Sequence, residues 1–408
     1  MLRSATLLGS SSGRNSGDAA LIAAIAGSID KACGRRLLYE VPTIRPSYIR
    51  NHYPDNVIPV ATLPWNFSVK LLGIPAWNSI RRTDLTLIFD AILFDRSLYN
   101  PLFNFMSTLY LFLPKARKTG RRMGFYNIGA GPVTTRAGRR MLRELSNMMD
   151  FITVRDEDSM AILRDIGVSN PRILLGADAA LNAPSAPDED VLPLIREAGL
   201  DPEREILALN INHYIDTWAH AAAPRLGREK FLEIYAAGAN RALNEIGSQV
   251  AVITTQHADV PISRELVSRL DPRLKPALIS NVQLDHMQIK GVLRRVAMLF
   301  GMRLHAMIMA SSELTPIIGL AYQPKVHHYY STLGIREFSL GFEDFTERNI
   351  AEHILRGWAR RDFLRSHLKT QMPRLQARAL AAASVVAAID RGEDLDAWFR
   401  NAANAAER

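Results

Sequence analysis

The chain of 408 residues contains a single cysteine, Cys33. One thiol cannot form an intramolecular disulfide, nor can it build a zinc or iron–sulfur site of several cysteines. The sequence also lacks a secretory signal, because the apolar stretch after Met1 ends at Leu8 and no small-residue cleavage site follows. We therefore expect a cytoplasmic protein whose mature chain begins at Met1.

No apolar run is long enough to span a bilayer, which takes ~20 residues. The longest aromatic and apolar run, residues 101–114, contains Asn104, Ser107 and Thr108. A buried core helix is the simpler interpretation, and the alternative is a surface that leans on the inner face of the plasma membrane. The cations that could meet anionic headgroups follow at once: Lys115, Arg117, Lys118, Arg121 and Arg122. Residues 101–122 are thus a candidate peripheral membrane contact.

Acidic residues are fewer than basic ones, which leaves a formal net charge of +9 and a pI near 9.7. Nucleic acid is one class of partner that such a charge suggests. The basic residues are scattered, however, and the sequence has no RNP, zinc-finger or basic-zipper signature. We expect no nucleic-acid partner, since anionic small substrates or a membrane surface account for the excess charge.

The composition is that of a globular protein, with 48% hydrophobic and 22% charged residues. Single cores tend to split beyond roughly 250–300 residues, so two domains are expected. Short apolar runs alternate with helical patterns, which predicts an α/β fold with two Rossmann-like, doubly wound domains facing a cleft. The best linker is the proline-containing and acidic stretch 182–191. The expected divisions are residues 1–183, residues 192–370 and a helical tail, residues 371–408.

The pattern predicts strands and helices in alternation. The expected strands are Ala5–Leu8, Leu85–Ile92, Arg122–Ile128, Phe151–Val154, Arg172–Leu175, Ile206–Asn212, Gln249–Thr254, Ala277–Ile279, Ala297–Phe300 and Pro316–Leu320. The expected helices are 18–29 with Asp18 as its cap, 156–166, 228–246, 261–270 and 284–296.

The segment 301–326 carries the strongest site signal. An apolar stretch ends at Gly301, and Arg303, Leu304 and His305 follow at the predicted start of a helix. Unpaired backbone N–H groups and the helix dipole favour an anion there. The arginine can bind a phosphate or carboxylate bidentately, and an imidazole, with an ordinary pKa of roughly 6.5, can exchange protons near neutrality. The alternative is a helix-capping arginine beside a core histidine.

A second candidate follows the predicted strand 151–154. Arg155 ends this strand and is expected to point into the cleft, while Asp156 or Asp158 can cap the next helix. The run of acids resembles a metal-binding D-x-D, but acids in a first helical turn stabilise the helix dipole without an ion. We favour capping and expect no metal site; the sequence also has no H-E-x-x-H.

The third candidate is the loop Gly9–Asp18, GSSSGRNSGD, whose small residues can bring the backbone close to a ligand. It matches neither the dinucleotide fingerprint nor the P-loop, and a plain tight turn explains it equally well. Gln256 and His257 follow another predicted strand and should face the cleft, although a surface turn explains them as well. The candidate substrate-binding residues are Asn15, Gly17, Asp18, Gly301, Leu304, Gln256 and His257.

A series of segments, in this order along the chain, resembles the polysaccharide pyruvyl transferase family. They are N-S-G-D (Asn15–Asp18), T-V-R-D-E-D-S (Thr153–Ser159), L-x-x-x-G (Leu163–Gly167), G-A-D-A-A-L (Gly176–Leu181), G-M-R-L-H-A (Gly301–Ala306) and P-I-I-G-L-A-Y-Q-P-K-V (Pro316–Val326). The resemblance covers residues 1 to about 340, and the ordered set is more specific than any one segment. The stretch 49–114 and the tail from Ala377 match no motif.

The resemblance implies a GT-B-like enzyme with phosphoenolpyruvate as donor and a hexose of a polysaccharide or lipid-linked precursor as acceptor. The product is a ketal, and phosphate is released. Arg303 and Arg155 would hold the donor's phosphate or carboxylate, and His305 would be the proton donor. The first domain would serve the acceptor and the second the donor. Beyond phosphoenolpyruvate as co-substrate, the resemblance implies no metal or nucleotide cofactor.

Two other functions compete with this interpretation. A glycosyltransferase of the same architecture would use a nucleotide-sugar donor, but the sequence lacks the E-x-x-x-x-x-x-E pattern that many such enzymes carry. A non-catalytic subunit that binds sugar precursors and recruits polysaccharide enzymes to the membrane is the second alternative, and the segment 101–122 is its best support.

Overall fold

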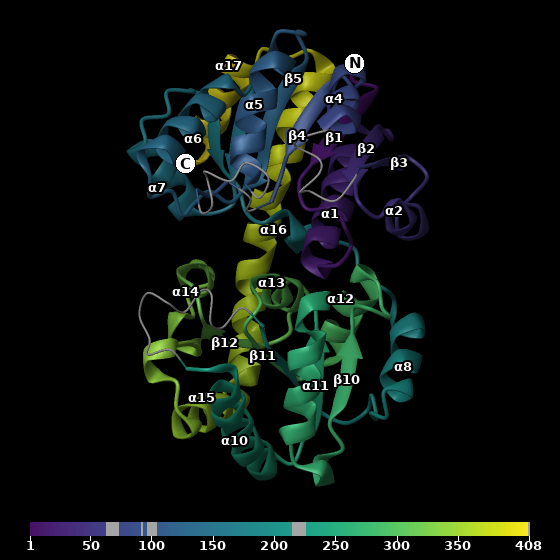
Figure 1. Ribbon diagram of the computed structural model, residues 1–408, viewed down its shortest axis with the longest axis vertical. Helices are drawn as coiled ribbons and strands as arrows, with labels where there is room; N and C mark the ends of the chain where they lie inside the picture. The colour runs from purple at the N-terminus through teal and green to yellow at the C-terminus, as the bar shows by residue number, and fades with distance from the viewer. Residues whose placement is uncertain (63–72, 91–92, 96–103, 214–225, 407–408) are drawn as a thin grey trace. The chain divides into compact units, whose positions relative to one another are not determined.

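The computed structural model describes residues 1–62, 73–90, 93–95, 104–213 and 226–406, which form two compact units (Figure 1). Unit 1 comprises Met1–Gly13, Asp18–Asn182 and Leu375–Arg408, and unit 2 comprises Arg14–Gly17 and Ala183–Arg374. The tail expected from residue 371 thus contributes Leu375–Arg408 to unit 1. Arg14–Gly17 belong to unit 2 although they follow the first strand of unit 1.

Among the described residues of unit 1, seven parallel strands form the sheet, in the order β3-β2-β1-β4-β5-β6-β7. Their bounds are β1 Ser4–Leu8, β2 Leu38–Thr43, β3 Val57–Ala61, β4 Leu85–Ile88, β5 Arg122–Ile128, β6 Phe151–Val154 and β7 Ile173–Leu175. The order reverses between β1 and β4, as in Rossmann-like folds. Strands β4 and β6 are buried along their whole length, which explains why each appears in the sequence as a short continuous apolar run.

In the part of unit 2 that the structure describes, six parallel strands form the sheet, in the order β10-β9-β8-β11-β12-β13. Their bounds are β8 Ile206–Asn210, β9 Gln249–Thr254, β10 Ala277–Ser280, β11 Met298–Gly301, β12 Ile317–Ala321 and β13 Ser339–Gly341. The order reverses between β8 and β11. Open parallel sheets bind ligands beyond the carboxyl ends of the strands at such a reversal, so residues that follow β8 and β11 are the first to consider.

Helices connect the strands and flank both sheets. Those of unit 1 are α1 Ser16–Cys33, whose first two residues belong to unit 2, and α2 Pro46–His52, α4 Gly73–Arg82, α5 Phe105–Arg117, α6 Arg136–Met148, α7 Glu157–Asp165 and α17 Leu395–Ala406. Those of unit 2 are α8 Asp188–Glu197, α10 Arg228–Ile246, α11 Val260–Arg269, α12 His286–Arg295, α13 Leu304–Ser312, α14 Pro324–Thr332 and α15 Glu347–Ala359. The long helix α16, Arg361–Arg391, begins in unit 2 and ends in unit 1.

Helix α5 contains most of the aromatic and apolar run, residues 101–114. Met106, Leu109, Leu113 and Ala116 lie in the hydrophobic core of unit 1, whereas Leu111 is 53% exposed. The core-helix interpretation is confirmed for Asn104 onward, and Pro101–Phe103 lie outside the described residues. In the part of the chain that the structure describes, no helix is long and apolar enough to cross a bilayer.

Several elements differ from the sequence prediction. Strands β2, β3 and β13 were not expected, and the stretch 182–191 is only in part a linker, because α8 begins at Asp188. The predicted cap of the first helix was also wrong. The helix begins at Ser16, and the Asn15 side chain accepts a hydrogen bond from Gly17 N at 2.9 Å, so Asp18 lies in the first turn.

Candidate active site

The reversal point of unit 2 is occupied by the junction between β11 and α13. Gly301 ends the strand, and a Cβ atom there would lie only 2.8 Å from Cγ of Met307, so a glycine permits the close turn of α13. Arg303 is the N-cap of α13, Leu304 is its first residue and is buried, and His305 is its second. The predicted position of Arg303 and His305 at a helix N-terminus is confirmed.

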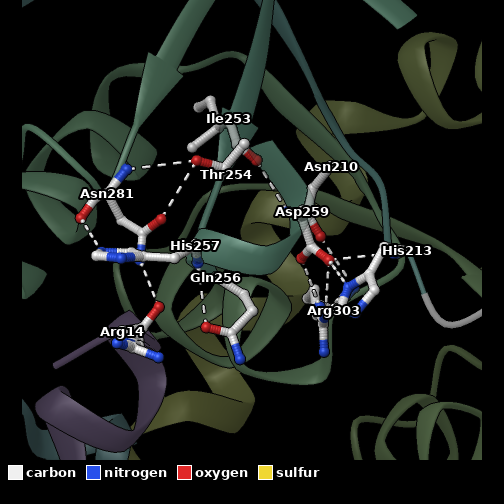
Figure 2. Close-up of polar contacts among 10 residues, drawn as sticks. All are labelled: Arg14, Asn210, His213, Ile253, Thr254, Gln256, His257, Asp259, Asn281 and Arg303. Atoms are coloured by element: carbon white, nitrogen blue, oxygen red, sulfur yellow. Dashed lines mark hydrogen bonds and ion pairs between the residues drawn. The ribbon is translucent and has the colours of Figure 1, made fainter. Parts of the chain in front are cut away.

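Asn210, the last residue of β8, fixes the start of α13. Its Oδ1 accepts a hydrogen bond from Arg303 N at 2.9 Å, and its Nδ2 donates to Ile253 O at 2.9 Å (Figure 2). The side chain is fully buried. One amide therefore joins the carboxyl ends of β8 and β9 to the cap of α13, so Arg303 is held from its backbone as well as from its side chain.

The Arg303 side chain is bound by Asp259, which ends a short 3₁₀ turn after β9 (Figure 2). Arg303 Nε donates to Oδ2 at 2.7 Å and Nη2 donates to Oδ1 at 2.6 Å, a bidentate pair. Asp259 is fully buried and the Arg303 side chain is 14% exposed. His213, three residues after β8, contacts the same Oδ1 through its backbone N at 3.1 Å and its Nδ1 at 2.7 Å.

These contacts control the charge of Asp259. Burial by itself would raise the pKa of Asp259, but hydrogen bonds from His213 and Arg303, together with the Arg303 charge, outweigh burial and hold it below its ordinary value. The carboxylate is therefore ionised at neutral pH. The buried Asp259 carboxylate and the Arg303 guanidinium depend on each other, because removing either one leaves a buried charge without a counter-charge.

The second part of the arrangement is the segment Arg14–Gly17, which binds to unit 2 through its backbone. Ser16 N donates to Thr255 O at 2.8 Å. Arg14 O accepts from His257 N at 2.9 Å and from Asn281 Nδ2 at 3.0 Å (Figure 2). Asn15 and Gln256 form an isolated antiparallel bridge. The residues after β9 thus hold the N-terminal loop, and Gln256 and His257 are more than a plain surface turn.

Gly17 lies directly against His305. A Cβ atom on residue 17 would lie 2.2 Å from both Cβ and Cγ of His305 and 2.4 Å from its Nδ1. Such distances do not occur between real side chains, so only glycine fits at this position. The His305 ring is half-buried, and the N-terminus of α1 limits where it can lie.

The rest of the N-terminal loop packs within unit 1. The Ser11 hydroxyl donates to Pro42 O at 2.6 Å, and Ser11 O accepts from Thr43 Oγ1 at 2.8 Å. Gly13 has a φ of 67° and lies against the Tyr48 ring, a conformation that favours glycine. The first part of the loop is therefore a packed turn, and only its last residues reach the arrangement around α13.

Arg155 lies in unit 1, at the end of β6, and its side chain is 8% exposed. Nε donates to Asp156 at 3.1 Å and Nη1 donates to Asp178 at 3.2 Å. Burial by itself would lower the pKa of Arg155, but Asp178, Asp156 and Asp90 raise it above its ordinary value. The guanidinium is charged and held among three carboxylates at the carboxyl edge of its sheet.

The structure brings most of the predicted residues together. Asn15, Gly17, Gln256, His257, Gly301, Arg303, Leu304 and His305 belong to unit 2. Arg155 and Asp18 belong to unit 1. A joint contact of Arg155 and Arg303 with one donor molecule therefore stays a prediction, as does a cleft between the domains.

The expected helix cap after β6 is confirmed. Asp156 is the N-cap of α7 and accepts from Ser159 N at 2.8 Å, so this acid serves the helix and Arg155. Among the described residues, no group of three or more His, Cys, Asp or Glu side chains could hold a metal ion.

The candidate residues predicted from the sequence did not include Asn210, His213 or Asp259. His213 and Asp259 are 46 residues apart in the chain and share no motif. The available signal was topological, since polar residues that follow neighbouring parallel strands meet at one sheet edge.

Comparisons with known proteins show the family and the fold of the chain. The sequence profile of the family described as polysaccharide pyruvyl transferase matches residues 15–324. The chain therefore belongs to the polysaccharide pyruvyl transferase family, and its class is that of a transferase. No curated protein sequence matches it significantly.

Solved structures show the fold. A putative UDP-N-acetylglucosamine 2-epimerase from Listeria monocytogenes is similar with a TM-score of 0.63 at 13% identity, covering 96% of this chain and 97% of that one. A UDP-GlcNAc 2-epimerase from Neisseria meningitidis has a TM-score of 0.58 at 10% identity, over 94% and 99%. A glycosyltransferase from Rickettsia africae has 0.56 at 10% identity, over 95% and 98%. The predicted GT-B-like class, with two Rossmann-like α/β domains, is confirmed.

Proposed function

We propose that the protein transfers the pyruvyl group of phosphoenolpyruvate to two hydroxyls of a hexose, in a polysaccharide or lipid-linked precursor, with formation of a ketal and release of phosphate. The observation that carries the proposal is the pair Arg303 and His305 at the start of α13, at the reversal point of unit 2. Both residues lie within the part of the chain that matches the family.

Pyruvyl transfer requires a general acid beside the bound phosphoenolpyruvate anion. The methylene carbon of phosphoenolpyruvate must gain a proton while a sugar hydroxyl attacks the adjacent carbon. His305 is assigned as the acid, because its imidazole lies one residue inside a helix N-terminus whose N–H groups attract an anion. Arg303, held in place by Asp259, would stabilise charge on the departing phosphate.

Phosphate release from phosphoenolpyruvate, with methyl galactoside, glucoside and mannoside as acceptors, tests the proposal. His305→Ala should lower kcat by about 100-fold or more, the usual contribution of a general acid. The matched control is His328→Ala, which removes an exposed histidine of α14 in the same unit and should retain activity. An undiminished rate in His305→Ala would reject the assigned acid, and no phosphate release with any acceptor would reject the function.

A nucleotide-sugar glycosyltransferase is the second candidate, and two similar structures that contain UDP favour it. One is of MnaA of S. aureus with UDP, and the other is of HepE of Anabaena with UDP. Thermal stability measured with phosphoenolpyruvate and separately with UDP separates the candidates. A ligand at 100 times its Kd adds about 2.7 kcal/mol to the free energy of unfolding. We expect phosphoenolpyruvate to increase the free energy of unfolding by this amount. An increase with UDP and none with phosphoenolpyruvate would favour the glycosyltransferase.

A lipid-linked acceptor would place the protein beside a membrane, and the outer face of α5 is the proposed contact. Leu111 is 53% exposed, and Lys115 and Lys118 at the end of the helix are exposed as well. Co-sedimentation with vesicles that contain anionic lipid should occur for the wild type and decrease for Leu111→Glu. The matched control is Phe363→Glu, a 43% exposed apolar residue of α16. Equal binding by both variants would contradict this contact.

A further inference from the structure

The proposed reaction needs a proton acceptor as well as a donor. Two acceptor hydroxyls lose their hydrogens during ketal formation, and one hydrogen ends on the new methyl carbon while the other ends on phosphate. His305 holds a proton when the first hydroxyl attacks, so it cannot accept that hydroxyl's hydrogen in the same step. A second basic group is expected close to Arg303.

His213 has the surroundings of such a base. Its Nδ1 lies 2.7 Å from Oδ1 of Asp259, and its backbone N donates to the same oxygen at 3.1 Å (Figure 2). Asp259 is fully buried, whereas the His213 side chain is 26% exposed. A buried carboxylate therefore fixes one edge of an imidazole whose other edge lies nearer to solvent.

The charge of Asp259 decides the tautomer of His213. Asp259 is ionised, because its partners hold its pKa below the ordinary value, and an ionised carboxylate only accepts hydrogen bonds. Nδ1 at 2.7 Å must then carry the hydrogen. The neutral ring consequently has its lone pair on Nε2, the arrangement in which an aspartate orients a histidine to act as a base.

The position of His213 fits the donor site. Its Nδ1 lies 3.3 Å from Nη2 of Arg303, and both side chains share Oδ1 of Asp259. Since Nδ1 carries a hydrogen, His213 Nδ1 and Arg303 Nη2 do not bond to each other. Both donate to Oδ1 of Asp259, which holds the two side chains together. An anion bound by Arg303 would thus have the imidazole beside it.

We propose that His213 is a second catalytic residue, the base that takes the proton of the attacking hydroxyl, and that Asp259 is its positioning residue. The inference rests on the proposed function. In the first step the hydroxyl oxygen forms a bond to C2 of phosphoenolpyruvate, the C2–C3 π electrons take the proton of His305, and His213 Nε2 takes the hydroxyl proton. When the bond between C2 and the phosphate oxygen breaks, phosphate leaves with the electron pair and accepts the proton from His213. The second hydroxyl then closes the ketal and returns a proton to His305.

The test compares His213→Asn with Asp259→Asn in phosphate release from phosphoenolpyruvate and a methyl hexoside. The amide of His213→Asn can still donate to Asp259 but cannot act as a base. We expect kcat to fall by about 100-fold, within the range for a general base, and KM for phosphoenolpyruvate to stay within about 3-fold. Asp259→Asn should lower kcat and also raise this KM, because Arg303 loses its bidentate partner.

Two outcomes would overturn the inference without touching the proposed function. One is wild-type kcat in His213→Asn, and the other is a loss confined to KM, which would assign His213 to the support of Arg303. A wild type that releases no phosphate would instead reject the proposed function itself.

A readout that needs no turnover is the imidazole ¹⁵N spectrum of histidine-labelled protein, in which His213 is assigned by its loss in His213→Asn. The Nδ1–H tautomer should appear in the wild type and give way to a mixture in Asp259→Asn. An Nε2–H tautomer in the wild type would contradict the geometry on which the base depends.

Discussion

The position of the His305 side chain depends on a glycine at residue 17. The position of its ring leaves no room for a Cβ atom on Gly17, which would lie 2.2 Å from Cβ and Cγ of the histidine. The backbone up to Gly17 is held in place, since Ser16 N donates to Thr255 O and Gly17 N donates to the Asn15 side chain. A side chain at residue 17 must therefore displace the histidine or the start of the helix.

Gly17→Ala should lower the rate of phosphate release by at least 10-fold, because about 1.4 kcal/mol of lost transition-state stabilisation has that effect. The matched control is Gly27→Ala on the same helix, where no heavy atom lies within 4 Å of the added Cβ. This control should retain activity and gain up to about 1 kcal/mol of helix stability. Equal activity of the two variants would show that Gly17 does not position His305.

His353, in the core of unit 2, is expected to make the stability of the protein depend on pH. Burial, reinforced by the charge of Arg356, lowers the pKa of His353 to about 4, and its Nε2 lies 3.1 Å from Phe338 O. The unfolded chain, with a histidine pKa of roughly 6.5, binds more protons than the folded chain between these two values. The free energy of unfolding should thus fall as the pH drops through this window, by up to about 3 kcal/mol.

His353→Gln retains an amide donor for Phe338 O and has no group that titrates there. Urea unfolding at pH ~7 and ~5 should show a smaller loss of stability for the variant than for the wild type. The same loss in both proteins would mean that His353 is protonated in the folded state.

Helix α12 begins with a capping box formed by Asp285 and Gln288. Asp285 Oδ1 accepts from Met287 N at 2.8 Å and Gln288 N at 2.9 Å, while Gln288 Oε1 accepts from Asp285 N at 3.1 Å. Asp285→Ala should cost about 0.5–2 kcal/mol in thermal or urea unfolding, and Asp285→Ser should recover most of it. Equal losses in the two variants would show that the cap does not stabilise the helix.

The elements that the sequence predicted well carry their signals locally. Helix α10 was predicted with its bounds, because its apolar face repeats regularly and Gly247, at a φ of 72°, ends it. The strands β5, β6 and β9 were predicted as observed, since they are short apolar runs. Strands β2 and β3 were missed because Pro42 and Pro59 interrupt them; β3 tolerates its proline as the edge strand of the sheet.

The candidate site was predictable only where one segment carries it. Arg303 and His305 are two residues apart, so the strand-to-helix pattern placed both of them. The Asp259–Arg303 pair joins residues 44 apart, and the contact of Gly17 with His305 joins two segments of unit 2 that are far apart in the chain. Such contacts depend on which strands become neighbours, and a single sequence does not state the strand order.

At the scale of the whole chain, the last helices complete unit 1. Asp390 of α16 accepts from Leu2 N at 2.6 Å and from Arg35 Nη2 at 2.6 Å, so it joins the start of β1 to the turn before β2. The Asp390 side chain is 6% exposed. Asp390→Ala removes the acceptor of Leu2 N and one of the two acceptors of Arg35 Nη2, and it should cost about 1–3 kcal/mol in urea unfolding.

The matched control on the same helix is Asp362→Ala, whose carboxylate is 88% exposed. An exposed ion pair contributes little, so the control should change stability by less than about 0.5 kcal/mol. If both variants unfold like the wild type, the tail is not an integral part of unit 1.

Product analysis is the most direct test of pyruvyl transfer to a sugar. The wild-type protein, phosphoenolpyruvate and a methyl hexoside are incubated together, and the sugar product is identified by mass spectrometry while phosphate is measured in the same sample. We expect a hexoside that carries one pyruvyl ketal, formed in equal amount to the phosphate released. Phosphate without a modified sugar, or sugar transfer from a UDP-hexose in place of pyruvyl transfer, would contradict it.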